Sequence, residues 1–171
     1  MKDFYHYSVM PEECIAALKI RPGGVYVDAT LGGGGHSSLI AAKLQDGFLI
    51  GIDQDQDAIA AAQERLSPFD RRFKAVKSNF SELRAVLARE GYQKADGILF
   101  DLGVSSYQLD EKSRGFSYRF DAPLDMRMDR ENPLDAFTVI NTYPQEKICD
   151  ILYRYGEEKR SPKIAAAICR K

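Results

Sequence analysis

The stretch between residues 25 and 53 constrains the fold of this chain most strongly. It contains a short apolar segment ending at Asp28, four consecutive glycines at positions 32 to 35, a short amphipathic segment, and a second apolar segment ending at Asp53. This order predicts a strand, a glycine turn, a helix and a second strand. Such a unit is typical of sheets that bind a nucleoside-bearing cofactor, because the glycines let backbone approach the ligand and the final acid can bind a ribose diol.

The same alternation continues along the chain and predicts an α/β fold with a parallel, right-handed doubly wound sheet. Strands are expected over residues 25–29, 48–53, 73–77 and 97–101, and helices over residues 11–18, 36–44, 57–66 and 81–90. Parallel sheets of this class bind their ligands beyond the carboxyl ends of the strands. We therefore expect Asp28, Asp53, the pair Asn79 and Phe80, and Asp101 to gather at one rim.

The pattern changes after Asp101. Residues 102–132 are rich in Gly, Ser, Asp and Arg and show no clear period. A loop of this length inside a compact domain usually serves a function or is disordered. Helices are expected again over residues 133–141, 144–155 and 162–170.

The composition narrows the class of protein. The chain has 171 residues, a net charge of −1 and three cysteines that lie far apart. An odd number of dispersed cysteines predicts neither a disulfide framework nor a zinc site, and a reducing, cytoplasmic compartment is the simplest interpretation. We expect no membrane segment, because no apolar run approaches the roughly 20 residues required. We expect no metal either, because His6 and His36 lack partners at ligand spacing.

The glycine turn distinguishes between cofactors. The dinucleotide fingerprint Gly-x-Gly-x-x-Gly fails, because Ser37 stands where the third glycine after Gly32 and Gly34 is required. An NAD-dependent oxidoreductase is therefore disfavoured. The spacing Asp28-x-x-x-Gly32-x-Gly34 instead matches the first motif of S-adenosylmethionine (SAM) methyltransferases. The carboxylate of SAM can use backbone N–H groups and a helix N-terminus, although a glycine turn without a ligand is the simpler alternative.

Three further residues have two interpretations each. Asp53 suits a bidentate contact to ribose hydroxyls, but it could also cap the helix that follows. Phe80 could lie beside an adenine or belong to the core. His36 stands at the opening of a helix, where the neutral imidazole is favoured, and we interpret it as shaping the cofactor loop and not as a general base.

Several sequence blocks together carry a family resemblance. The chain closely resembles the bacterial small-subunit (16S) ribosomal RNA cytidine N4-methyltransferases, the RsmH/MraW family. The matching blocks are the glycines with His36, Asp53, Asp101-Leu-Gly-Val-Ser-Ser, Gln108-Leu-Asp, Arg114-Gly-Phe-Ser, Pro123-Leu-Asp-Met-Arg-Met-Asp, Tyr155-Gly-Glu-Glu and the opening His6-Tyr-Ser-Val-Met-Pro.

This resemblance implies a Rossmann-like SAM-dependent methyltransferase that acts on the exocyclic N4 amine of a cytidine in small-subunit ribosomal RNA. It implies SAM contacts at Gly34, Gly35, His36, Asp53, Phe80, Asp101 and Gln108. It also implies two regions: residues 1–132 as the SAM-binding domain with an incomplete sheet, and residues 133–171 as the beginning of a helical substrate-recognition insertion.

The chemistry assigns roles around the fourth strand. The amine of cytosine is a poor nucleophile, so an acceptor on its N–H would assist, and Asp101 is the candidate catalytic residue unless it contacts SAM alone. Ser105 and Ser106 could orient the base or only form a tight turn. Arg114 belongs to a segment of arginines and aromatics that suits single-stranded RNA, or that forms a salt-bridged loop with its own aspartates.

Members of the family are considerably longer than this chain. We therefore expect a fragment that is weak or inactive in RNA methylation, with an alternative role as a non-catalytic SAM-binding or ribosome-assembly module. Residues 97–100 would then form an unpaired apolar strand edge, which favours self-association.

Overall fold

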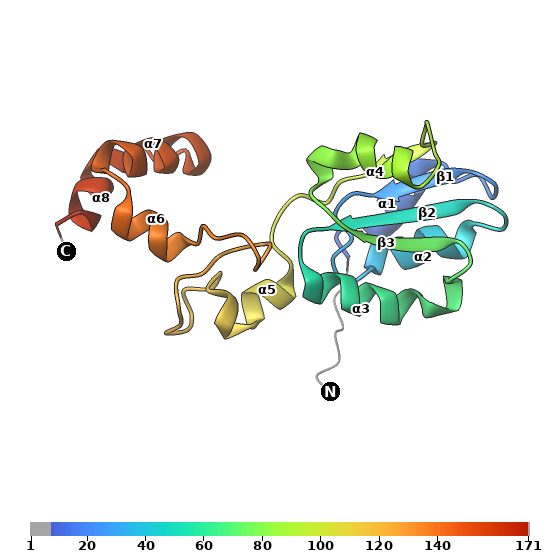
Figure 1. Ribbon diagram of the computed structural model, residues 1–171, viewed down its shortest axis with the longest axis horizontal. Helices are drawn as coiled ribbons and strands as arrows, with labels where there is room; N and C mark the ends of the chain where they lie inside the picture. Colours follow the sequence, from blue (N-terminus) through green and yellow to red (C-terminus); the bar gives the residue numbers. More distant parts are fainter. Residues whose placement is uncertain (1–7, 171) are drawn as a thin grey trace. The chain divides into compact units, whose positions relative to one another are not determined.

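The computed structural model describes residues 8–170, and the chain divides into two compact units, up to Tyr107 and from Gln108 onward (Figure 1). The sequence predicts a functional boundary at residue 132 instead. That boundary stays a prediction, because the packing of this chain does not report where a substrate-recognition insertion begins.

The first unit is an α/β layer structure, as the alternation predicts. Its four parallel strands run in the order β3-β2-β1-β4. The first four strands of a doubly wound, Rossmann-like sheet have the same order. The elements in chain order are α1 (Pro11–Leu18), β1 (Val25–Asp28), α2 (Gly35–Lys43), β2 (Phe48–Asp53), α3 (Gln56–Leu66), η1 (Ser67–Phe69), β3 (Phe73–Lys77), η2 (Phe80–Glu82), α4 (Leu83–Arg89) and β4 (Gly97–Leu99).

Helices cover both faces of this sheet, so its central strands are apolar on both sides (Figure 1). Alternate residues of β1 point to opposite faces: Tyr26 belongs to the core cluster formed with α1, α2 and α3, and Val27 belongs to the cluster formed with α4. Leu49 and Ile50 divide in the same way on β2. This packing fixes the register of the strands and therefore aligns their carboxyl ends.

The fourth strand is shorter than predicted. β4 ends at Leu99, whose carbonyl accepts a hydrogen bond from Ala29 N–H, and the expected strand residues Phe100 and Asp101 lie in the following loop. The reason is that Asp101 N–H donates to the side chain of Thr30 and not to a neighbouring strand. β4 is also an edge strand of the described sheet, and its Ile98 is 40% exposed.

The helix predicted over residues 81–90 begins differently from the expectation. Asn79 Oδ1 accepts a hydrogen bond from Ser81 N–H, and this cap starts the short 3₁₀ turn η2, with α4 following only at Leu83. Gly91 ends the segment with φ of 85°, a conformation that favours glycine.

The second unit is helical, and α7 and α8 pack together within it. The buried contacts of this pair include Ile148 and Ala165. The region expected to be a loop contains two short helical elements, because residues too few to show a period can still form a single turn. The elements are α5 (Ser106–Asp110, which crosses the boundary), η3 (Lys112–Arg114), α6 (Ala136–Thr142), α7 (Gln145–Gly156) and α8 (Ser161–Ile168).

The helix α6 starts three residues after the predicted start at residue 133. Asp135 is its N-cap, and the Asp135 carboxylate accepts a hydrogen bond of 2.7 Å from Thr138 N–H. A side chain of this type satisfies a free N–H of the first helical turn and so stabilises a helix start at this position. Within residues 8–170, no helix has the length and apolar character needed to cross a membrane.

Candidate functional site

The predicted rim exists in the first unit. Asp28 ends β1, Asp53 ends β2, and Phe80 and Asp101 follow β3 and β4, so all four lie at the carboxyl ends of neighbouring parallel strands. The glycine turn between β1 and α2 lies at the same end. The carboxyl ends of such a sheet form the usual ligand crevice of this fold class.

The glycine turn requires its glycines at particular positions. Gly32 and Gly34 have φ of 50° and 75°, the left-handed region in which other residues are strained. A Cβ on Gly34 would also lie 3.0 Å from Leu66 and 3.3 Å from Ala62, both on α3. The turn therefore packs tightly against α3, and α2 begins directly after it at Gly35.

Asp53 organises this turn with its carboxylate. One oxygen accepts Gly32 N–H at 2.8 Å and the other accepts Asp55 N–H at 2.9 Å. The alternative role as a helix cap belongs to Asp55, which accepts Asp57 N–H at 3.0 Å. Burial raises the pKa of Asp53, and the backbone hydrogen bonds from Asp55 and Gly32 offset part of this rise. A carboxylate can accept about four hydrogen bonds, so the backbone donors Asp55, Gly32 and Gln54 leave acceptor capacity for a further donor.

Asp28 is a structural carboxylate beneath the turn. It is 1% exposed and accepts Ser37 Oγ–H at 2.7 Å and Thr30 N–H at 3.2 Å. Burial raises the pKa of Asp28, although the hydrogen bond from Ser37 lowers it in part. The pair ties the end of β1 to the first turn of α2. Sequence analysis noted Asp28 as part of the motif but missed Ser37 as its partner.

Asp101 is the exposed carboxylate of the rim. Its side chain is 44% exposed, and its backbone N–H donates to Thr30 Oγ1 at 2.7 Å. Thr30 was missed by sequence analysis, although it stands two residues after Asp28 in the motif. The bond from Asp101 to Thr30 holds the loop after β4 against the glycine turn.

His36 is almost fully buried beside these groups. Its Nε2 lies 2.8 Å from the carbonyl oxygen of Val9, and its Nδ1 lies 3.8 Å from Oδ2 of Asp101. The contact with Val9 connects the segment before α1 to the start of α2, and the role of His36 in shaping a cofactor loop stays a prediction. The nearby Ser8 contacts Gly35, so the segment before α1 lies directly on the turn.

Phe80 offers a partly open aromatic face. Its ring is 40% exposed and packs edge-to-face against Phe100, with 5.8 Å between the ring centroids. Exposure of this size argues against the alternative that Phe80 is a core residue. Phe100 was missed, although an aromatic directly before Asp101 is a visible signal. The neighbouring Asn79 is occupied as a cap and as a donor to Gln54.

The remaining predicted site residues divide between the units. Ser105 and Ser106 belong to the first unit, where Ser105 is half-buried and Ser106 is exposed at the start of α5. Gln108 and Arg114 belong to the second unit. Gln108 is buried and its amide donates to Met128 Sδ at 3.3 Å. Its contact with a cofactor stays a prediction.

Arg114 has a structural environment. It is fully buried, and its guanidinium donates to the carbonyl oxygens of Arg127 at 2.8 Å and Met128 at 3.2 Å. Met126 N–H in turn donates to the carbonyl oxygen of Arg114. This burial argues against the direct RNA contact that the sequence suggests for Arg114, and it supports a role in holding the loop.

The same loop contains the predicted alternative, a salt bridge within the arginine-rich segment. Arg127 pairs with both carboxylate oxygens of Asp125, at 3.0 and 2.6 Å, and also donates to the carbonyl oxygens of Arg130 and Asn132. The hydrogen bond from Arg127 lowers the pKa of Asp125. The exposed side chains of this segment include Tyr118, which is 98% exposed, together with Arg119 and Arg130.

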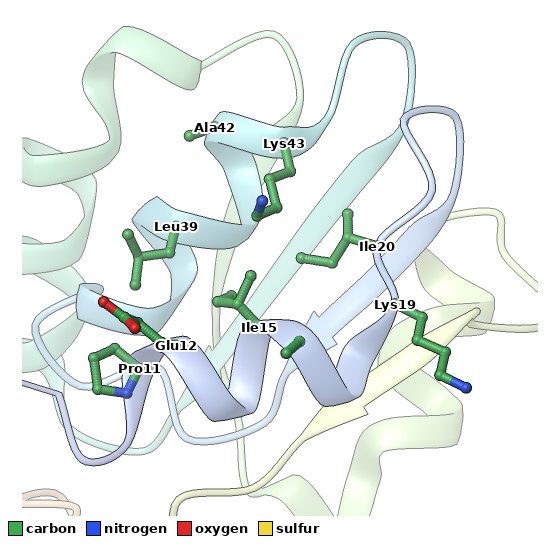
Figure 2. Close-up of a pocket in the computed structure, with 9 residues that line it drawn as sticks. Pro11, Glu12, Ile15, Lys19, Ile20, Leu39, Ala42 and Lys43 are labelled. Atoms are coloured by element: carbon green, nitrogen blue, oxygen red, sulfur yellow. The ribbon is translucent and has the colours of Figure 1, made fainter.

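An apolar groove lies between α1 and α2, away from the strand ends (Figure 2). Ile15 and Leu39 face it, with Lys19 and Lys43 at its border. Asp53, Asp101 and the glycine turn do not line it, so it is not the candidate cofactor site. Among residues 8–170, no group of three or more His, Cys, Asp or Glu side chains could hold a metal ion.

Known proteins resemble this chain along its whole length. Residues 3–171 match the model of the MraW methylase family. A Ribosomal RNA small subunit methyltransferase H of Brevibacillus brevis is 54% identical over 96% of this chain and 53% of that protein. The one of Carboxydothermus hydrogenoformans is 52% identical over 99% of this chain and 54% of that protein.

A more distant likeness is to the crystal structure of the C-terminal domain of precorrin-6Y C5,15-methyltransferase from Rhodobacter capsulatus. The TM-score is 0.45, with 23% identity over 57% of this chain and 50% of that chain, a likeness too low to support an argument. The chain spans about half the length of the curated relatives it matches. The match over residues 3–171 and identities above half show that the chain belongs to the MraW methylase family.

Proposed function

We propose that this chain is the SAM-binding part of a methyltransferase that acts on the N4 amine of a cytidine in small-subunit ribosomal RNA. The main support for this proposal is the rim of the first unit, where the Asp53 carboxylate, the glycine turn and the exposed Asp101 lie at neighbouring strand ends. Membership of the MraW methylase family and the names of the relatives support the reaction and the RNA substrate.

The residues of the rim fit SAM. Asp53 keeps acceptor capacity for a ribose diol after its bonds to Gly32 and Asp55, and a Cβ on Gly32 would meet only the carbonyl oxygen of Thr30, at 3.9 Å. The space above Gly32 therefore leaves room for a ligand to approach backbone. Phe80 provides an exposed ring for an adenine. We propose Gly34, Gly35 and His36 as the turn that binds the amino-acid end.

SAM, when bound, supplies an electrophilic methyl group on a sulfonium sulfur. The protein contributes position and electrostatics. Asp101 is the proposed catalytic residue, because an exposed carboxylate can accept a hydrogen bond from the N4 amine and then its proton. Ser105 and Ser106, in the loop that follows, are proposed to orient the base, which must leave any stack to be methylated.

The RNA surface is proposed to include the solvent-exposed Arg119 and Tyr118, since stacking and charge together suit single-stranded RNA. Arg114 is proposed to hold the loop through the carbonyls of Arg127 and Met128 and not to contact RNA. Gln108 is proposed as a SAM contact, and residues 133–171 are proposed as the start of the substrate-recognition insertion. A cytoplasmic location fits the three cysteines, which are free thiols.

The test combines binding with methyl transfer. Calorimetry measures the affinity for SAM, and labelled SAM with small ribosomal subunits or their RNA measures transfer, after which the modified nucleotide is mapped. We expect SAM binding, with any label found as N4-methylcytidine. Binding without transfer would favour the non-catalytic module for this chain. Tighter binding of NADH than of SAM would contradict the assignment.

Self-association through β4 is a second proposal, favoured by the exposed apolar edge. Ile98, Phe100, Leu102 and Val104 are all at least 40% exposed. An apolar edge strand is a template for pairing with another copy. Sedimentation over a concentration series should show dimers or larger species that Ile98→Lys reduces. A monomer at every concentration would contradict this proposal.

A further inference from the structure

The imidazole of His36 has two different partners. Nε2 lies 2.8 Å from the carbonyl oxygen of Val9, whereas Nδ1 lies 3.8 Å from a carboxylate oxygen of Asp101. The residue is 6% exposed, so bulk water contributes little to its hydrogen bonding. The protein groups on each side of the ring therefore determine where its protons lie.

The Val9 contact fixes the tautomer. A carbonyl oxygen only accepts hydrogen bonds, so Nε2 must carry the hydrogen and donate it. In the neutral ring, Nδ1 then has a lone pair. This lone pair faces the carboxylate of Asp101, which is also an acceptor. The distance of 3.8 Å exceeds a direct hydrogen bond but shortens readily when a proton enters between two acceptors.

We propose that His36 is a positioning residue for Asp101 that takes up, through this carboxylate, the proton released by methyl transfer. The inference rests on the proposed function. As the N4–C bond forms, the S–C bond breaks, its electron pair stays on sulfur, and N4 must lose one proton. The Asp101 carboxylate accepts that proton and Nδ1 of His36 takes it next. Asp101 returns to its charged form beside an imidazolium, and no other reactant is needed.

The charges around His36 are balanced for this exchange. Asp28, at the end of β1, is a second carboxyl group that interacts electrostatically with His36. Arg65, on α3, lies beside Gly35 and opposes a positive charge on the ring. Asp101 is the more exposed of the two carboxylates and is the one that faces Nδ1.

The segment before α1 holds the ring in place. Ser8 contacts Gly35, and the Val9 carbonyl accepts from Nε2, so the ring cannot rotate without breaking this hydrogen bond. Met10, the next residue, has φ of 47° and turns the chain into α1. The ring orientation is thus set by a contact far from Asp101 in sequence.

The first experiment does not require activity. Long-range ¹H–¹⁵N spectra of the imidazole rings distinguish the two neutral tautomers, and the chain contains only one other histidine, His6, so His6→Gln assigns the signals. We expect the Nε2–H tautomer for His36 at a pH where the ring is neutral. A dominant Nδ1–H tautomer would overturn the proposal, because Nδ1 could then take no proton.

The second experiment distinguishes proton uptake at Nδ1 from the hydrogen bond that Nε2 makes with Val9. Gln at position 36 places its amide N–H near the position of Nε2 and keeps the Val9 contact, but it cannot take a proton. We expect His36→Gln to keep the melting temperature of the wild type, because the Val9 contact remains, and to slow single-turnover methyl transfer at saturating SAM by about 10²-fold. His36→Ala also loses the Val9 contact, so it should lower the melting temperature as well.

A transfer rate of His36→Gln equal to that of the wild type would mean that His36 only anchors Val9, and the proposal would be wrong. Failure of the wild-type chain to bind SAM would count against the proposed function, whereas the tautomer would still decide on Nδ1. The two failures are therefore distinguishable.

Discussion

In the rim of the first unit, carboxylates accept backbone N–H groups, whereas in the second unit arginines donate to backbone carbonyls. Asp53 accepts two such N–H groups and keeps acceptor capacity for a ligand. Arg127 donates to two carbonyls and pairs with Asp125. Both regions are rich in charge in the sequence. The carboxylates of the rim therefore keep acceptors open to the proposed ligand, whereas the charges of the long segment mainly hold a loop together.

The largest expected effect is the loss of SAM affinity when Asp53 in the rim is replaced. Asp53→Ala removes the proposed ribose acceptor and the acceptor for Gly32 and Asp55, so the affinity for SAM should fall by at least about 10²-fold. Calorimetry measures this loss. The control is Asp70→Ala, an exposed aspartate near β3, which should bind like the wild type. Unchanged affinity of Asp53→Ala would remove the ribose assignment.

The next largest effect is a loss of stability of the second unit when Arg114 is replaced. Arg114→Ala leaves the carbonyls of Arg127 and Met128 without a buried donor, so the free energy of unfolding of the second unit should fall by about 3 kcal/mol. Denaturant unfolding measures it, and proteolysis should cut residues 115–135 sooner. The matched control Arg119→Ala, exposed in the same segment, should leave stability unchanged. Equal stability of the two variants would contradict the buried role of Arg114.

Alanine substitutions at two glycines test how tightly the glycine turn packs against α3. Gly34 and Gly91 have φ of 75° and 85°, but only at Gly34 would a Cβ meet neighbours within 4 Å. Alanine should therefore cost about 1 kcal/mol at Gly91, from strain alone, and about 1–2 kcal/mol more at Gly34. Thermal unfolding of both variants measures the difference. Equal losses would show that α3 yields to the added methyl group.

The smallest effect is a pH dependence of opposite sign in the two regions. Burial raises the folded pKa of Asp28 and Asp53 above the ordinary 3.8, so the folded protein binds these protons more tightly than the unfolded chain does. The stability that the two protonated groups contribute is therefore lost as the pH rises from 3.8 through their folded pKa values. Asp125 has a lowered folded pKa, so its contribution is lost as pH falls below 3.8.

Chemical denaturation from pH 7 toward pH 4 measures the first part of this contrast. The wild type should gain stability relative to Asp28→Asn over this range, because the neutral amide does not titrate. A wild type that loses stability relative to this variant would show that the hydrogen bonds from Ser37 and Thr30 outweigh the burial of Asp28.

Much of the first unit follows from local sequence. The strands β2 and β3 and the helix α1 have the predicted bounds, because apolar runs and their flanking turns are local signals. The strand ends therefore locate Asp28 and Asp53 without knowledge of the fold. The predicted end of β4 was wrong, because the strand end depends on a hydrogen bond from Asp101 N–H to Thr30, a residue distant in sequence.

The sequence by itself determined the parallel sheet, the glycine turn and the family, since periodicity and motif spacing are properties of neighbouring residues. Only the tertiary structure decided which charges are available to a ligand. Asp55 and not Asp53 caps α3, Arg114 is buried beneath its own loop, and His36 joins Val9 to Asp101. These partners are set by packing between segments far apart in the chain, and no local pattern contains that information.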